Sequence, residues 1–391
     1  MKKIITLILT SLFFTPIFSQ QESGIINSNN YFSFDIYQKL KSSNENLIFS
    51  PASITSAIAM TYVGSKNNTF EEIGNTFYFN KNITEFSKDY KNLVYFNSEK
   101  SNIKFYNANS IWLQDGLKLS QDFLDINKKD FSSSLNLTDF INHPEKSRIA
   151  INNWVEQNTN KKITNLLQPS SIDNATRLVL VNALYFKGSW KNKFIKDKNT
   201  KENFQIGKRE FVKTEYMNKA INTFYYSSKY AQIVEVPYSD NKVSLLIIVP
   251  KSFKKIKKLE KNLNNEFYSS YLENKVRKRV NLSIPKFSIE SDFDLNKTLS
   301  NLGMKEAFTG LADFSGITES EKLYISKVIH KANISVDEEG TEAAAATAVM
   351  MRKTSILLDE TTMKINKPFI FILRNTKTNC IYFMGKIVNP N

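Results

Sequence analysis

Side chains that bind metals or act as nucleophiles are scarce in this sequence. Its 391 residues include one cysteine, Cys380, and two histidines, His143 and His330. A single cysteine cannot form an internal disulfide, and these three residues are too few for a structural zinc site of the Cys/His type. We therefore expect no metal or other cofactor, and a fold that is held together by its apolar core.

Motifs of common enzyme classes are also missing. The sequence contains no G-x-S-x-G, the motif that places the nucleophile of many serine hydrolases on a sharp turn. It contains no glycine-rich loop of the kind that binds phosphates. No Cys–His pair stands near a recognisable signature. We therefore predict that the protein is not an enzyme.

The apolar run at the N-terminus is short for a membrane-spanning helix. It reads MKKIITLILTSLFFTPIFSQQ, with Lys2 and Lys3 before the apolar residues and the small Ser19 after them. This order is typical of a secretory signal peptide, whereas a membrane-spanning helix needs roughly 20 apolar residues. We predict a signal peptide over residues 1–19 and a mature protein that is exported, either to the periplasm or to the extracellular space.

No segment of the remaining chain looks like a linker between domains. There is no Gly/Ser/Pro-rich stretch, no block of like charges and no internal repeat. Hydrophobic residues make up 41% of the sequence, which is enough for a large core and argues against disorder. We predict a single domain over residues 20–391.

The net charge of +15 suggests a polyanionic partner. The densest group of cations lies in KSFKKIKKLEKN, and the candidate polyanion-binding residues are Lys254, Lys255, Lys257 and Lys258. The alternative is a lysine-rich helix face that is simply solvated. Nucleic acid is a poor candidate, because the chain has no RNA-binding aromatic motif or zinc finger and is predicted to be exported.

Helical and strand patterns are mixed along the chain. Ser50 followed by Pro51 is a typical helix start. A second helix is predicted in IAINNWVEQNTNKKITNLL, with these residues buried: Ile149, Trp154, Ile163 and Leu166. Apolar runs predict strands at residues 178–186, 243–250 and 280–289.

The stretch GTEAAAATAV, residues 340–349, fits neither pattern well. Alanine favours a helix, but the stretch lacks the apolar stripe that docks a helix on a core. As a strand it would carry small side chains on both faces, apart from Glu342. No proline between Gly340 and Lys367 bars it from a central strand. The residues alone leave both interpretations open.

Six motifs, taken together and in order, resemble the serpin family. They are NLIFSPASI, LVLVNALYFKGSW, IPKFSIESDFDL, GMKEAFTGLADFSGI, VIHKANISVDEEGTEAAAATAV and INKPFIFILRNTKTNCIYFMGKIVNP. The match covers nearly all of the chain after the signal peptide. It implies an α+β fold of three β-sheets and about nine helices, with an exposed reactive-centre loop over about residues 338–358. It also implies a monomeric suicide inhibitor of serine proteases, and it leaves cysteine proteases open as a further target class.

The resemblance gives the alanine stretch a role. In this family a protease cuts the loop as a substrate, and the cut loop then enters the main sheet as a new central strand and carries the acyl-enzyme with it. Small residues at the hinge allow fast entry, and Gly340 is a flexible pivot. The hinge residues are Gly340, Thr341, Glu342, Ala343, Ala344, Ala345, Ala346 and Thr347, and the resemblance implies that Thr341, Ala343, Ala345 and Thr347 face the interior after insertion.

Two further groups of residues correspond to functional regions of the family. The first is the shutter, a hydrogen-bonded cluster beneath the centre of the main sheet, and it consists of Ser50, Ser53, Asn182 and His330. The second is the breach, the point where the loop first enters the sheet, and it consists of Trp190, Lys286 and Glu338. The resemblance implies an ion pair between Lys286 and Glu338 that gates entry.

The spacing that is usual in the family, counted from Gly340, puts the scissile bond between Thr354 and Ser355. A shift by one or two residues would instead present Lys353 or Arg352 to the acidic pocket of a trypsin-like protease. A small Thr suits elastase-like or subtilisin-like enzymes, so both target classes stay open. The alternative function is a serpin-like binding protein or chaperone without inhibitory activity.

Overall fold

The computed structural model describes residues 24–94, 103–131, 134–341 and 359–391. The predicted signal peptide lies outside the described residues. The α-helices of the described chain are Ile25–Leu40 (α1), Pro51–Tyr62 (α2), Asn67–Phe77 (α3), Ile83–Val94 (α4), Gln121–Ile126 (α5), Pro144–Asn158 (α6), Ile256–Lys261 (α7), Asn265–Asn274 (α8) and Asn296–Ser300 (α9). The short helical segments are Asn127–Phe131 (η1, a π-helix), Lys196–Lys198 (η2), Phe253–Lys255 (η3) and Glu306–Phe308 (η4).

The strands form two hydrogen-bonded sheets in the described chain. The smaller sheet has the order β10-β11-β12-β4-β2-β3, and its strands are Phe287–Asp294 (β10), Lys327–Val336 (β11), Gly340–Thr341 (β12), Leu178–Ser189 (β4), Lys104–Gln114 (β2) and Ser134–Thr138 (β3). The larger sheet has the order β1-β15-β14-β8-β7-β6-β9-β13 with β5 also paired to β6, and its strands are Leu47–Phe49 (β1), Ile381–Ile387 (β15), Phe369–Asn375 (β14), Val243–Pro250 (β8), Ala231–Pro237 (β7), Phe211–Ser227 (β6), Val276–Pro285 (β9), Glu360–Lys364 (β13) and Thr200–Gln205 (β5).

The predicted α+β class is confirmed, and nine α-helices lie within the described residues. Two of the three expected sheets are joined, because the 17-residue strand β6 belongs to both. Its first part pairs with β5 and its middle part pairs with β9, while its last residues pair with β7 and so lead into β8 and β14. One long strand therefore connects what would otherwise be separate sheets.

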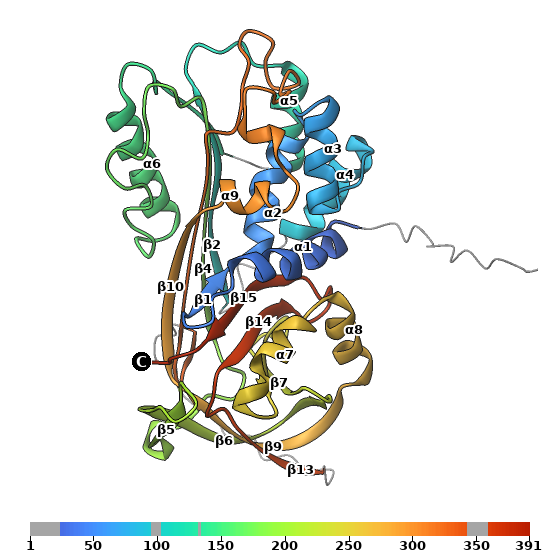
Figure 1. Ribbon diagram of the computed structural model, residues 1–391, viewed down its shortest axis with the longest axis vertical. Coiled ribbons are helices and arrows are strands. Elements are labelled where there is room, and N and C mark those ends of the chain that lie inside the picture. Colours follow the sequence, from blue (N-terminus) through green and yellow to red (C-terminus); the bar gives the residue numbers. More distant parts are fainter. Residues whose placement is uncertain (1–23, 95–102, 132–133, 342–358) are drawn as a thin grey trace, which may run out of the picture.

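The six-stranded sheet has helices on both faces. Helix α6 lies on one face, and helices α1 to α4 lie on the other (Figure 1). Side chains alternate between these faces along β4, as they do in any strand. Leu180 and Leu184 belong to the main core, whereas Val181 and Tyr185 belong to a smaller core beneath α6. A strand added between β4 and β11 at the level of α6 would therefore be buried on both sides.

The predicted start of α2 is confirmed. The Ser50 side chain accepts a hydrogen bond from the Ser53 backbone N–H, and Pro51 occupies the first turn. Proline is favoured there because its missing N–H would have no partner in the helix. All of α2 is buried, which places Ser50 and Ser53 beneath the six-stranded sheet.

The predicted second helix is shorter than expected. Helix α6 ends at Asn158, because Asn160 and Lys161 adopt left-handed backbone conformations with φ of 52° and 57°. Ile149 is 45% exposed, so its predicted burial is wrong. Ile163 and Leu166 are buried as predicted, but they lie in the segment after the helix.

The three predicted strands are present with one correction. Strands β4 and β8 cover the runs at 178–186 and 243–250. The run at 280–289 is divided between β9 and β10, which belong to different sheets. The break falls at Lys286, whose backbone N–H donates to the carbonyl oxygen of Glu215 instead of continuing either ladder.

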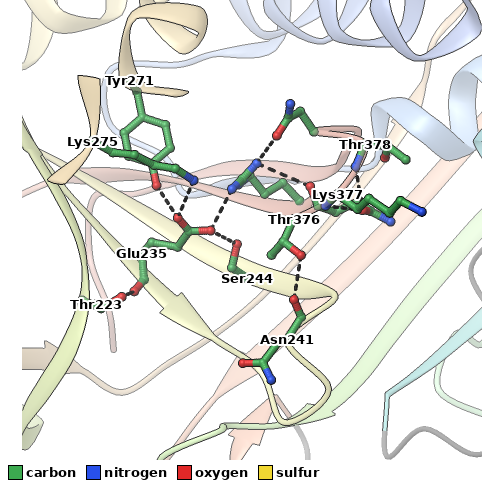
Figure 2. Close-up of polar contacts among 12 residues, drawn as sticks. Thr223, Glu235, Asn241, Ser244, Tyr271, Lys275, Thr376, Lys377 and Thr378 are labelled. Atoms are coloured by element: carbon green, nitrogen blue, oxygen red, sulfur yellow. Dashed lines mark hydrogen bonds and ion pairs between the residues drawn. The ribbon is translucent and has the colours of Figure 1, made fainter. Parts of the chain in front are cut away.

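A buried ion pair ties β7 to β14 inside the larger sheet (Figure 2). Glu235 and Arg374 are 4% and 1% exposed, and Arg374 Nη2 lies 2.9 Å from Glu235 Oε1. Burial alone would raise the pKa of Glu235, but Arg374 and the hydroxyls of Ser244 and Tyr271 lower it to about 2. The carboxylate therefore stays charged in the native state. No helix in the described part of the chain is both long and apolar enough to cross a membrane.

Arg374→Met should lower the free energy of unfolding by about 3–5 kcal/mol, because it leaves the charge of Glu235 buried without its main partner. Denaturant titration at neutral pH would measure the loss. Adding Glu235→Gln to this variant should restore part of it, and Lys377→Met, on the exposed turn nearby, should change stability by no more than about 0.5 kcal/mol. Equal losses in the Arg374 and Lys377 variants would contradict the account.

Candidate functional site

The parallel pairing of β4 and β11 stops before the two strands end. Residues 179–185 of β4 pair with residues 327–333 of β11. Beyond this point β12 lies between them, with Gly340 opposite Ser189 and Thr341 opposite Gly188. On its other side Thr341 pairs with Val336 of β11. The sheet is therefore already open at one end, and a short strand occupies the opening.

Gly340 makes the closest approach in this opening. Its φ is +149°, and a Cβ atom added there would lie 2.0 Å from the carbonyl oxygen of Gly188. Only glycine fits without moving the backbone of β4. The structure thus requires at this position the residue that the sequence suggested as a pivot.

Thr341 is fully buried and is held by aromatic residues. Its Oγ1 lies 2.6 Å from the Tyr238 hydroxyl, and the Tyr238 ring stacks on Trp190 with centroids 4.4 Å apart. Trp190 in turn donates from Nε1 to the carbonyl oxygen of Asp337 and from its backbone N–H to that of Glu339. The breach tryptophan therefore holds the chain that leads into β12.

The two charged breach residues lie together beside this chain. Lys286 Nζ is 3.1 Å from Glu338 Oε1 and 3.7 Å from Glu215 Oε2. The side-chain amide of Asn199 donates to both carboxylates. Partial burial opposes ionisation of both partners, yet hydrogen bonding and charge raise the pKa of Lys286 and lower that of Glu338. This partly buried pair stabilises the observed path of residues 337–339.

The four shutter residues form one hydrogen-bonded cluster between α2 and the sheet. The Ser50 backbone N–H donates to His330 Nε2 at 3.0 Å. Asn182 Nδ2 donates to Ser53 Oγ at 2.6 Å and to Asn109 Oδ1 at 2.8 Å. His330 and Asn182 are opposite each other in the β4–β11 register, and their side chains also bond to each other. The cluster therefore links β4 and β11 across the line along which they pair, which we call the seam.

These contacts fix the state of the His330 ring. Because Nε2 accepts a hydrogen bond, the proton of the neutral imidazole lies on Nδ1, which donates to Asn182. His330 is fully buried, and this burial lowers its pKa to about 3. The ring is neutral at physiological pH.

Sequence reasoning missed three residues of the site: Asn109, Tyr238 and Asn199. Asn109 pairs with Asn182 in the β2–β4 register, and Ser53 Oγ donates to its side chain at 2.8 Å. A polar residue at a core-facing position of the strand KFYNANSIWLQ was the available signal. Tyr238 and Asn199 lie in connections outside the strands, so no periodic pattern points to them.

Other predicted residues are not part of this site. The hinge residues beyond Thr341 and the candidate scissile residues Arg352, Lys353, Thr354 and Ser355 lie outside the described residues. The side chains of Lys254, Lys255, Lys257 and Lys258 are exposed on η3 and α7. Lys258 Nζ lies 5.3 Å from the centre of the Tyr230 ring. Within the described ranges, no three His, Cys, Asp or Glu residues are grouped to hold a metal ion.

Comparisons with known proteins agree on one family. Residues 27–390 match the family model described as Serpin (serine protease inhibitor). Serpin B4 of Homo sapiens is 38% identical over 390 residues, which cover 94% of this chain and 100% of that protein. Leukocyte elastase inhibitor of Xenopus tropicalis is 36% identical over 375 residues, which cover 92% and 98%.

The solved structures add the shape of the fold. The crystal structure of human thyroxine-binding globulin in complex with thyroxine matches with a TM-score of 0.84 and 28% identity. The match covers 94% of this chain and 98% of that one. The same fold is thus found in proteins whose names describe inhibition and in one whose name describes binding of a small molecule.

Stability should depend on pH through His330. The unfolded chain binds a proton at about pH 6.5, whereas the folded chain does so only near pH 3, so stability is fully present above pH 6.5 and is lost as the pH falls toward 3. Between pH 7 and pH 5 this one group should cost about 2 kcal/mol of unfolding free energy. Denaturant titrations of wild type and His330→Gln would measure it.

The variant should lose that part of the pH dependence, while His143→Gln, which changes the exposed second histidine, should keep it. If His330→Gln and wild type lost the same stability between pH 7 and pH 5, the buried neutral histidine would not be the cause.

Proposed function

The chain belongs to the serpin family, and we propose that it is a suicide-substrate inhibitor of serine proteases rather than an enzyme. One observation carries the proposal: β12 already lies between β4 and β11, at the open end of a seam that continues between the same two strands. A loop cut beyond β12 can extend this strand into the seam. Serpin loop insertion is an established example of such strand addition.

The register of β12 defines where each following residue would go. Each step along the loop from Thr341 moves one step back along both β4 and β11. In the inserted state Thr347 would therefore stand opposite Asn182 and His330, the pair whose side chains now bond across the seam. Its hydroxyl could replace the bond that insertion breaks.

The same register explains the need for small residues. Ala343 and Ala345 would share the main-core face with Thr341, and Ala344 and Ala346 would lie on the face beneath α6. Ala344 would come opposite Tyr185, a member of the smaller core. Alanine can enter between filled layers without displacing them, whereas larger side chains would need repacking that costs about 1–3 kcal/mol.

Backbone hydrogen bonding would supply the driving force. A central strand of ten or more residues bonds on both sides but replaces the existing β4–β11 pairing, so the net addition is about one ladder, at about 0.5–1.5 kcal/mol for each bond. The total is on the order of 10 kcal/mol, which compares with the whole stability of many small domains.

The chemistry would be supplied by the target protease. Its serine oxygen bonds to the carbonyl carbon of the scissile residue, the peptide C–N bond breaks, and the new amine leaves on the C-terminal side. Insertion then carries the ester-linked enzyme away before water can hydrolyse the ester. The scissile bond is proposed to be Thr354-Ser355, for elastase-like or subtilisin-like enzymes, with Arg352 and Lys353 as alternatives for trypsin-like ones.

We further propose that the protein acts outside the cytoplasm as a monomer. Export rests on the N-terminal pattern of residues 1–19, which is typical of a signal peptide, and the monomeric state rests on the resemblance to the serpin family. The competing function is a serpin-like binding protein without inhibition, because thyroxine-binding globulin has the same fold.

Mixing the mature protein with trypsin, and separately with an elastase, tests the proposed covalent inhibition. A denaturing gel should show a stable complex at the summed mass, and the released C-terminal peptide should begin at Ser355, Thr354 or Lys353, depending on the bond that is cut. Clean cleavage without a complex would favour the binding protein instead.

Thr347→Arg should convert the inhibitor into a substrate. The loop would still be cut, but its insertion would bury a guanidinium in the shutter without a partner. The complex band should therefore disappear while the cleaved band grows. Thr347→Ser keeps the hydroxyl and should keep the complex, and a persistent complex with Thr347→Arg would show that the loop does not enter as far as the shutter.

A further inference from the structure

A cleft with an excess of positive charge opens where β6, β7 and β9 meet the turn after β4. Its volume is about 380 Å³, and its lining includes Lys191, Asn222, Phe224, Lys275, Arg277 and Arg374. We call it the basic cleft. Its lining carries four cations, and Glu235 is the one carboxylate among them, which leaves a net charge of +3.

The single carboxylate is fully engaged in the interior. Glu235 accepts hydrogen bonds from Arg374 at 2.9 Å, Ser244 at 2.6 Å and Tyr271 at 2.5 Å, and Lys275 lies 3.2 Å away (Figure 2). Arg374 keeps one buried donor, Nε, without a partner among the described residues. The negative charge of Glu235 is therefore engaged by buried partners. It does not neutralise Lys191 and Arg277, the two cations at the rim of the cleft.

The rim cations lack acidic partners. Lys191 and Arg277 are exposed, and neither forms an ion pair with any residue that the structure describes. Two cations contact the Phe224 ring, with Lys275 Nζ at 4.3 Å and the Arg277 guanidinium carbon at 4.9 Å from its centre. Burial, and then the neighbouring arginines, lower the pKa of Lys275 despite Glu235. An incoming carboxylate would relieve this crowding of positive charge.

The cleft lies near described residues that flank the segment 342–358 on each side. Lys191 follows Trp190, whose backbone N–H donates to the carbonyl oxygen of Glu339 at 2.9 Å. Arg277 is two residues from Arg279, whose backbone N–H donates to the carbonyl oxygen of Asp359 at 3.0 Å. A protein that engages this segment as a substrate is thereby brought close to the basic cleft.

From this geometry we propose that the basic cleft receives acidic side chains on the surface of the attacking protease. The inference rests on the proposed inhibitory function and adds a determinant of partner choice outside the scissile bond. Complementary charge at such a site mainly accelerates association, by tenfold or more at low ionic strength, and salt screens the effect. Proteases with an acidic surface near the active site should therefore be the preferred targets.

Two matched enzyme pairs test this. One pair is an anionic and a cationic trypsin, which share a primary specificity, and the other is subtilisin before and after succinylation of its lysines. Wild type should inhibit the acidic member of each pair about tenfold faster at low salt, and the advantage should vanish near about 0.5 M salt. Lys191→Glu combined with Arg277→Glu should remove or reverse the advantage without changing the stoichiometry of inhibition.

Lys128→Glu combined with Lys129→Glu is the control, because it makes the same change of charge just after α5, at the end of the molecule opposite β13 (Figure 1). It should keep the advantage. An unchanged preference in the cleft variant, or an equal loss in the control, would overturn the proposal.

If neither enzyme pair forms a covalent complex, it is the inhibitory function that fails. The cleft is then tested by equilibrium binding of the same enzymes with their active-site serines blocked. Binding of the acidic members should still depend on Lys191 and Arg277, and binding that ignores both residues would overturn the proposal.

Discussion

The open end of the β4–β11 seam is the constraint on which the rest of the structure depends. Two parallel strands pair over seven residues and then separate around β12, which Gly340 allows to approach the backbone of β4. Three contacts near the opening stabilise this arrangement. Trp190 binds the chain before β12, Tyr238 binds Thr341, and Glu338 forms an ion pair beside them. In the proposed inhibitor, this opening is where the cut loop would enter the sheet.

The shutter would oppose the proposed entry of the loop. In the closed sheet each polar group of Ser53, Asn109, Asn182 and His330 that faces the seam has a partner, so separating the strands exposes buried polar groups before new bonds form. This cost is local and comes early, whereas the gain from a full new ladder comes late. If the loop inserts as proposed, the polar cluster sets the barrier to insertion and the added ladder sets the final gain.

Local sequence patterns were enough for some features and not for others. The cap at Ser50 and the strands β4 and β8 follow from short-range rules, and six motifs in order identified the family and the α+β fold. The end of α6 was missed because it depends on left-handed conformations at Asn160 and Lys161, for which apolar spacing gives no signal. Asn109, Tyr238 and the Glu235–Arg374 pair were missed because they depend on contacts between distant segments, which only the register of the sheets brings together.

The melting temperature before and after a single cut in the loop tests the central claim most directly. If the cut loop enters the seam, the added ladder should raise the melting temperature by roughly 10 °C or more, given a gain on the order of 10 kcal/mol. An unchanged melting temperature in a cleanly cut protein would show that the seam does not accept the loop, and would contradict the account of the molecule as an inhibitor.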